Sequence, residues 1–147
     1  MNIMVYIPEP TYTITYLFRR ILVPTDGSEQ SLKALNLAVD FALRYGSKIT
    51  ALYIAYEKQD KSYIEEVKRK ILEISQRGGV DIECKIRYFN PAKSSIVKEI
   101  VRESIDGPYD AVIIGSQGVG GLGGEIVMGE AAIHAVIFIP KTVVIVR

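Results

Sequence analysis

The stretch that decides the fold is RILVPTDGS, residues 20–28. Within it, Ile21–Pro24 form a short apolar run that is typical of a strand buried on both faces. Thr25–Ser28 end the run with residues that favour turns and helix N-termini. From Ser31 onward, apolar residues recur at the spacing of an amphipathic helix, which Gly46 would end. This stretch therefore predicts a buried strand, a polar turn and a helix.

The alternation of strand and helix continues along the rest of the chain. Further strands are predicted at 49–56, 82–89, 111–114 and 142–146, and helices from Asp60, over 96–105 and over 125–138. This alternation is typical of a parallel sheet with helices on both faces. We therefore expect an open five-stranded α/β fold.

The composition of the strands predicts their places in the sheet. The strands at 21–24 and 111–114 are apolar throughout, as central parallel strands are. The strand at 82–89 alternates in polarity, which predicts an edge strand with one face open to solvent. Its apolar face would consist of Ile82, Cys84, Ile86 and Tyr88.

The last strand predicts a partner. Val143–Val146 are apolar, and no later element flanks them. Because an open apolar edge is an aggregation hazard unless another chain pairs with it, we expect a homodimer joined through Val143–Val146.

Composition and charge exclude several classes of protein. The chain has 147 residues, enough for one domain, and 18 Lys+Arg against 17 Asp+Glu. This near-neutral balance argues against a nucleic-acid partner and against a membrane anchor. The single cysteine, Cys84, and the lack of a signal-peptide pattern indicate a cytoplasmic protein. A lone histidine, His134, makes a catalytic triad a poor hypothesis.

The first seventeen residues stand outside the alternating pattern. Thr11–Tyr16 have high strand propensity but belong to none of the predicted units. Residues 1–17 are therefore interpreted as an N-terminal extension and residues 18–147 as the domain. The extension is either a leader without a role in the fold, or an extra edge strand or arm that packs on a partner subunit.

Two polar loops are predicted to meet at the carboxyl ends of the strands. One is Thr25–Ser28, and the other is the glycine-rich segment Gly115–Gly124. If their strands are neighbours, the loops form the crevice in which open α/β sheets bind ligands. Glycines let backbone N–H groups approach an anion, so this loop suits a phosphate. It lacks the Gly-Lys-Ser/Thr of a Walker loop, and it follows the wrong strand for a dinucleotide motif.

These motifs resemble those of the universal stress protein family. The resemblance rests on residues 20–28, on the turn Asn90–Ala92, on residues 114–118 with Gly121-Leu122, and on the closing strand 143–146. It covers about residues 18–147. It implies a Rossmann-like, adenine nucleotide alpha hydrolase-like fold with strand order 3-2-1-4-5. It also implies a stress-response module that binds ATP or AMP without efficient catalysis.

The resemblance also implies a set of binding residues. Pro24, Thr25 and Asp26 would face the adenosine, Ile49 would contact adenine through its backbone, and Ile114, Gly115, Gly118 and Gly129 would supply backbone contacts to ribose and phosphates. Asp26 suits a ribose hydroxyl or an adenine amine better than a phosphate, because its charge repels phosphate. Asp26 alternatively serves only to cap the following helix.

The second half of the loop departs from the pattern of ATP-binding relatives. Ten residues instead of nine separate Gly118 from Gly129, and Glu130 replaces the serine or threonine whose hydroxyl contacts phosphate in those relatives. Two like charges about 4 Å apart oppose each other by roughly 4 kcal/mol at an effective dielectric near 20. A Mg²⁺ ion bridging Glu130 and the phosphates would reverse the sign.

Two other functions stay open. The chain could be a dimeric interaction module of the same family, with its nucleotide site disabled by Glu130 and the longer loop. It could also be a hydrolase that uses Asp26 and a metal held by Glu130. Glu130 alternatively only complements the dipole of its helix.

Overall fold

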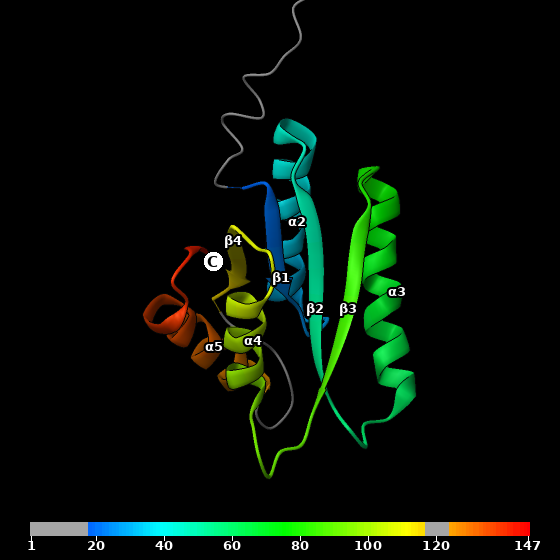
Figure 1. Cartoon of the computed structure of the whole chain (residues 1–147). Helices are drawn as coiled ribbons and strands as arrows, with labels where there is room; N and C mark the ends of the chain where they lie inside the picture. Colours follow the sequence, from blue (N-terminus) through cyan, green and yellow to red (C-terminus); the bar gives the residue numbers. More distant parts are fainter. Residues whose placement is uncertain (1–17, 117–123) are drawn as a thin grey trace, which may run out of the picture.

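The computed structural model describes residues 18–116 and 124–147, the side chains of 124–128 and 130 excepted. Strands and helices alternate through these ranges (Figure 1). The elements are β1 (Arg20–Pro24), α2 (Glu29–Tyr45), β2 (Lys48–Tyr56), α3 (Lys61–Gly78), β3 (Ile82–Phe89), α4 (Ile96–Asp106), β4 (Ala111–Gly115), α5 (Gly124–Phe138) and β5 (Thr142–Val146). Each lies within about two residues of its predicted place. The predicted extension, residues 1–17, lies outside the described residues.

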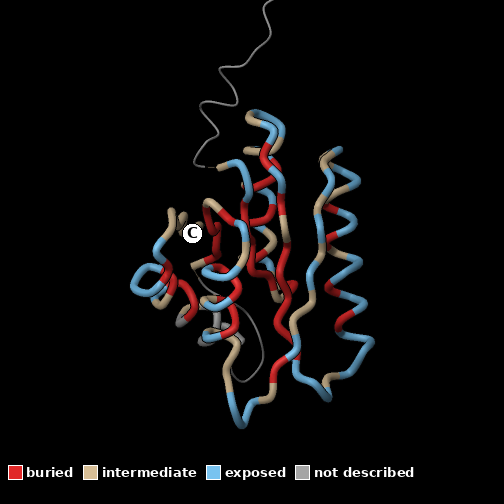
Figure 2. Tube along the Cα trace, viewed as in Figure 1, coloured by how far each residue is buried: buried red, intermediate tan, exposed pale blue. Residues whose placement is uncertain are grey.

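The strands form one parallel sheet in the order β3-β2-β1-β4-β5. This order confirms the predicted open five-stranded α/β fold. Strand β1 lies between β2 and β4, with Pro24 opposite Leu52 in the register. Figure 2 shows β4 buried along its length and β1 buried from Ile21 to Pro24, as their apolar sequences predict. Strands β3 and β5 occupy the two edges.

Caps fix where the helices begin and end. Ser28 is the N-cap of α2, and its hydroxyl accepts a hydrogen bond from the Ser31 N–H. Gly46 ends the helix in the left-handed conformation, with φ at 75°. Asp60 caps α3 in the same manner as Ser28 caps α2. These boundaries bring the N-terminus of α2 directly onto the end of β1.

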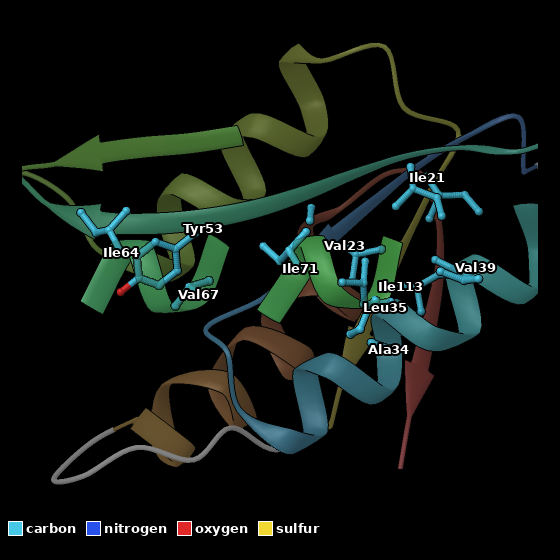
Figure 3. Packing of buried hydrophobic residues seen from close by; sticks show 14 of the residues in the cluster. Ile21, Val23, Ala34, Leu35, Val39, Tyr53, Ile64, Val67, Ile71 and Ile113 are labelled. Atoms are coloured by element: carbon cyan, nitrogen blue, oxygen red, sulfur yellow. The ribbon is translucent and has the colours of Figure 1, made fainter. Parts of the chain in front are cut away.

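Two apolar cores lie on opposite faces of the sheet. Helices α2 and α3 cover one face, and α4 and α5 cover the other. Strand β1 serves both, because Ile21 and Val23 face the α2–α3 core and Leu22 faces the other. Figure 3 shows Val23 lying together with Leu35 of α2 and Ile71 of α3 in the first core. The cores fix the helices that carry the loops at the end of the sheet.

The charged face of β3 differs from the prediction. We expected it to be open to solvent, but α4 covers part of it with two carboxylates, Glu99 and Glu103, which are only 4% and 2% exposed. Lys85 of β3 contacts Glu103 at 2.7 Å, and Arg87 contacts Glu99 at 2.8 Å and Glu103 at 2.7 Å. Tyr109 donates a further hydrogen bond to Glu103 at 2.8 Å. The alternating charges of β3 therefore mark a buried ionic contact.

The predicted apolar face of β3 also ends earlier than expected. Tyr88 is more than half exposed, and the next residue, Phe89, is buried on the opposite face. The place of β3 at an edge of the sheet is nevertheless confirmed. Among the helices of the described ranges, none is both long and apolar enough to cross a membrane.

The ionic contact keeps both glutamates charged. Burial alone raises the pKa of Glu103, but hydrogen bonds from Lys85, Tyr109 and Arg87 outweigh it and hold the pKa below its ordinary value. Burial likewise raises the pKa of Glu99, and hydrogen bonds from Ser94 and Arg87 reverse that effect. The attachment of α4 to β3 therefore depends on two ionised carboxylates.

Replacing Glu103 by glutamine should destabilise the protein by about 2–3 kcal/mol, since it removes a buried charge that pairs with the partly buried Arg87 and the more exposed Lys85. The value lies at the low end for a broken buried pair because Lys85 is 45% exposed. Urea unfolding at neutral pH measures the loss. A Glu66→Gln substitution, which breaks an exposed contact on α3, is the control and should leave the unfolding midpoint unchanged.

The difference between the native chain and Glu103→Gln should disappear in acid. A carboxyl whose folded pKa is lowered stabilises the fold above its unfolded pKa, about 4.3, and the benefit is lost as the pH falls through the folded pKa. Unfolding curves from pH 7 to pH 3 measure this convergence. A constant difference across the range would show that charge is not the source of the stabilisation.

Candidate functional site

The carboxyl ends of β1 and β4 lie side by side at the point where the strand order reverses. Strands β1 and β4 are neighbours, but β1 leads into α2 on one face of the sheet and β4 leads toward α5 on the other. Such a switch point leaves a crevice at the carboxyl ends of the strands. Thr25 and Asp26 follow β1 there, and Ser116 follows β4. The strands that carry the two loops are thus neighbours, as the prediction required, while residues 117–123 of the second loop, Gly118 among them, lie outside the described residues.

Thr25 holds the β1 loop together from within. It is 3% exposed, and its N–H donates to the carbonyl oxygen of Leu52 at 2.8 Å. Its hydroxyl lies 2.8 Å from the hydroxyl of Ser31 and accepts a hydrogen bond from the Gly27 N–H at 3.3 Å. The side chain and the N–H of Thr25 are therefore already used, so Thr25 shapes the site rather than donating to a ligand.

Asp26 has one carboxylate oxygen in use and one to spare. Its Oδ1 accepts the N–H of Ser28 at 2.9 Å, which forms an Asx turn, and the N-cap itself is Ser28. Among the described residues, Oδ2 has no hydrogen-bond partner. The backbone of the turn is held from α3: Tyr63 donates to the Asp26 carbonyl at 3.1 Å, and Lys70 donates to the Gly27 carbonyl at 3.1 Å. Asp26 is thus a fixed acceptor at the edge of the crevice.

Gly115 lets β4 touch the first turn of α2. A Cβ atom at this position would lie 2.8 Å from the Gln30 carbonyl oxygen, which is backbone and cannot move aside. Gly115 therefore permits the close approach of the two elements that bound the crevice. Beside this contact, the Gln30 Oε1 atom is buried and has no hydrogen-bond partner among the described residues. Such an acceptor is the kind of group that a ligand N–H would satisfy.

Gly129 lies in the second turn of α5, which begins at Gly124. Only the first four N–H groups of a helix lack an intrahelical acceptor, so the Gly129 N–H is not free to bind a phosphate as expected. A Cβ atom there would lie 3.9 Å from the Ser116 carbonyl oxygen, which shows that α5 passes close to the end of β4. Glu130 follows in the same helix. The Glu130 side chain is not among those that the structure describes.

Ile49 is not brought to the crevice. It pairs with Ile21, three positions before the pair of Pro24 and Leu52, which places it about 10 Å from the edge at about 3.3 Å per residue. The residue is buried in the α2–α3 core instead. Ile114 and Pro24 are also buried, each at the carboxyl end of its strand.

Two tyrosines, Tyr53 of β2 and Tyr63 of α3, lie near the Asp26 turn. Tyr53 follows Leu52, and its ring centroid lies 6.1 Å from that of Tyr63. Burial raises the pKa of Tyr53 to about 12, so its hydroxyl stays protonated, and it accepts a hydrogen bond from Gln59 at 2.5 Å. Sequence reasoning missed both residues. Counting the register from Pro24 along the next strand would have found Tyr53.

The remaining candidate residues have structural surroundings. Cys84 is half-buried in β3, and burial raises the pKa of its thiol, which disfavours the reactive thiolate. The ring of His134 lies 5.6 Å from that of Phe138 within α5. Within residues 18–116 and 124–147, no group of three or more His, Cys, Asp or Glu side chains is arranged to hold a metal ion.

An open parallel sheet with helices on both faces and a switch point between β1 and β4 defines a Rossmann-like α/β protein. The chain belongs to the universal stress protein family, whose sequence model matches residues 17–147. A universal stress protein of Staphylococcus aureus (strain USA300) is 30% identical over 149 residues, which cover 91% of this chain and 86% of that protein.

Solved structures of the family have the same fold. A universal stress protein from Archaeoglobus fulgidus, in complex with dAMP, superimposes with a TM-score of 0.66 at 18% identity and covers 89% of this chain and 99% of that one. Another universal stress protein, in complex with cAMP, gives a TM-score of 0.64 at 19% identity, with coverages of 89% and 98%.

The two glycines at the site should respond to alanine in opposite directions. Gly115→Ala should destabilise the protein by about 2 kcal/mol, because the new Cβ meets the backbone of α2. Gly129→Ala should stabilise it by up to about 1 kcal/mol, because glycine is a poor residue inside a helix and the new Cβ has ordinary contacts. Thermal or urea unfolding measures both. Equal effects of the two substitutions would contradict the described packing of β4 on α2.

Proposed function

We propose that this universal stress protein binds an adenine nucleotide in the crevice between the β1 and β4 loops. The observation that carries the proposal is the juxtaposition, at the switch point, of a fixed carboxylate with a spare oxygen and a glycine-bounded strand end. The family members in complex with dAMP and cAMP support the choice of an adenine nucleotide.

The described residues suit the two ends of a nucleotide differently. Asp26 Oδ2 is an acceptor for a ribose hydroxyl, and its negative charge keeps phosphate away from the β1 side. The N-terminus of α5, at Gly124, offers free N–H groups and a favourable dipole to the phosphate. The buried Oε1 of Gln30 is an acceptor for an adenine amine. These assignments orient the nucleotide with its base toward α2 and its phosphate toward α5.

The number of phosphates is limited by Glu130. Where the ATP-binding pattern has a hydroxyl, this chain has a carboxylate, which opposes each added phosphate charge. We therefore favour AMP over ATP as the ligand. A Mg²⁺ ion would lessen the opposition by bridging Glu130 and the phosphates, so the preference should be strongest without the metal.

The proposed role is binding without efficient catalysis. A hydrolase would need a positioned general base or a metal to activate water. Asp26, the candidate base of the alternative hydrolase reading, accepts the Ser28 N–H and is built into a turn. Nucleotide binding would act by biasing a conformational or partner equilibrium. We place this activity in the cytoplasm.

Calorimetric titration of AMP and ATP into the native chain and Glu130→Ser tests the proposal. The native chain should bind AMP more tightly than ATP in the absence of Mg²⁺. Glu130→Ser should tighten ATP binding about thirtyfold, which corresponds to roughly 2 kcal/mol. This is half of the repulsion of roughly 4 kcal/mol between two like charges about 4 Å apart at an effective dielectric near 20. AMP binding should change less, because AMP carries less charge.

A second variant, Asp26→Asn, tests the part that the Asp26 charge plays in the site. Asp26→Asn keeps an acceptor for Ser28 but removes the charge, and it should retain the fold while weakening AMP binding several-fold. If neither nucleotide binds the native chain or Glu130→Ser, the proposed function is wrong and the interaction-module reading is favoured. Phosphate release above background with Mg²⁺ or Mn²⁺, abolished in Asp26→Asn, would favour the hydrolase.

We also propose that the chain forms a homodimer through β5. This strand is an edge of the sheet, and its residues Val143–Val146 are half-buried in the single chain. Helix α5 adds to the same side: Ile133, Val136 and Ile137 are each more than half exposed, on a helix that is apolar on all sides. Their helical spacing turns them away from α4, which lies beside His134 and Phe138.

Val136→Glu should convert the dimer to a monomer, because it places a charge in an apolar interface while leaving the core of the single chain unchanged. Light scattering at micromolar concentration should give twice the mass of one chain for the native protein and the mass of one chain for the variant. Leu72→Glu, an equally exposed apolar position on α3, should stay dimeric. A native protein of single-chain mass would overturn the dimer.

A further inference from the structure

A second hollow, unrelated to the crevice, runs between α4 and α5. It has a volume of about 910 Å³. Its apolar walls come from Phe89 of β3, Val97, Val101 and Ile105 of α4, and Phe138 of α5. Ile105 is 48% exposed and Phe138 is 55% exposed, so these side chains are only partly covered by the fold. The volume lies within the range of about 300–1,000 Å³ that small-molecule pockets have.

One end of this α4–α5 groove is positively charged. Lys98 lines it in the first turn of α4, and Arg102 lines it one helical turn further, at the middle of the helix. Lys98 has no ionic partner among the described residues. Arg102 shares the single carboxylate of Glu99 with Arg87, at 2.7 and 2.8 Å. Arg87 is also paired with Glu103, so the positive charge in excess at this end comes from Lys98, beside the nitrogens of Arg102 that Glu99 does not engage.

The opposite end of the groove has the opposite character. Asp106, the last residue of α4, lines it beside Ile105 and Phe138. A negatively charged group would be repelled there and attracted by Lys98 and Arg102. The charge of the groove therefore changes along α4, from Lys98 and Arg102 to Asp106, and the apolar side chains of Val101 and Ile105 lie between these charged positions in the sequence. Helix α4 has 11 residues, so the groove can follow it for about 16 Å.

We infer that the α4–α5 groove binds a free fatty acid, an unbranched acyl chain with a single carboxylate. The acyl chain lies along Val101, Ile105 and Phe138, where it covers the exposed apolar surface. The carboxylate meets Lys98 and the free nitrogens of Arg102. The cationic end distinguishes this occupant from a neutral apolar molecule, which would leave that charge unanswered.

A second copy of the chain fits the groove less well. The most exposed apolar residues of α5 are Ile133, Val136 and Ile137, and they point away from α4. They therefore do not line the α4–α5 groove. A dimer through β5 would use them and leave the groove open. The fatty-acid site is independent of the nucleotide crevice as well, because none of its named residues lies in the β1 or β4 loops.

Titration of dodecanoate below its micelle concentration tests this site in the full chain. The native protein should bind it with micromolar Kd, and dodecanol and dodecyltrimethylammonium should bind at least tenfold more weakly. Lys98→Gln should weaken dodecanoate about fivefold without affecting dodecanol. Ile105→Glu, at a half-exposed position, should abolish binding of dodecanoate. Leu72→Glu on α3 is the matched control and should bind as the native chain does.

Four outcomes would overturn the inference. Equal affinity for dodecanoate and dodecanol would show that the cations take no part. Binding of dodecanoate that persists in Ile105→Glu would place the ligand elsewhere. Sedimentation with vesicles of anionic phospholipid, without binding of monomeric dodecanoate, would make the groove a membrane contact. A lower mass of Ile105→Glu in light scattering would make it an interface between copies of the chain.

Discussion

The fold and the crevice both depend on the contact between Gly115 and the first turn of α2. There, β4 approaches the backbone of Gln30 so closely that no side chain fits between them. This contact brings the ends of β1 and β4 to the same point and holds the N-terminus of α2 over them. A larger residue would push β4 away from α2 and widen the switch point. The lack of a Cβ atom at Gly115 therefore sets the distance between β4 and α2 where a ligand would lie.

The polar groups around that contact are divided between structure and ligand. The hydroxyl pair of Thr25 and Ser31 is buried and satisfied within the loop, so it stabilises the turn and leaves nothing for a ligand. Asp26 does both, with one oxygen in the turn and one free. The tethers from Tyr63 and Lys70 fix the same turn from α3. An acceptor that is held before the ligand arrives loses little entropy on binding.

The sequence was most informative where a single local rule decided the outcome. The strands of residues 20–24 and 111–115 could be predicted because they are apolar on both faces, and Gly46 marked a helix end through its left-handed conformation. The adjacency of β1 and β4 was also among the features predicted, with the strand order 3-2-1-4-5. A local structural role for Asp26 was foreseen as a helix cap, but the structure gives it an Asx turn, and the N-cap is Ser28.

The expectations that the structure did not meet share a different cause. They concern residues whose roles depend on how neighbouring helices and strands are placed relative to each other. Ile49 was misplaced because only the register with β1 shows which residue of β2 reaches the edge. The role of Gly129 depended on where α5 begins. The charges of β3 indicated a solvent-exposed face until α4 supplied Glu99 and Glu103. Spacing along one element does not show what another element brings to it.

The ionic contact between α4 and β3 also determines how α4 moves. Apolar side chains tolerate small sliding of a helix, because one methyl contact replaces another. Two buried carboxylates that face fixed cations do not, since any partial separation leaves charges without partners. Helix α4 is therefore either packed on β3 or detached from it, with no stable position between the two. Its backbone amides would then exchange with solvent as one cooperative unit, and the wall that α4 gives the α4–α5 groove has a single position.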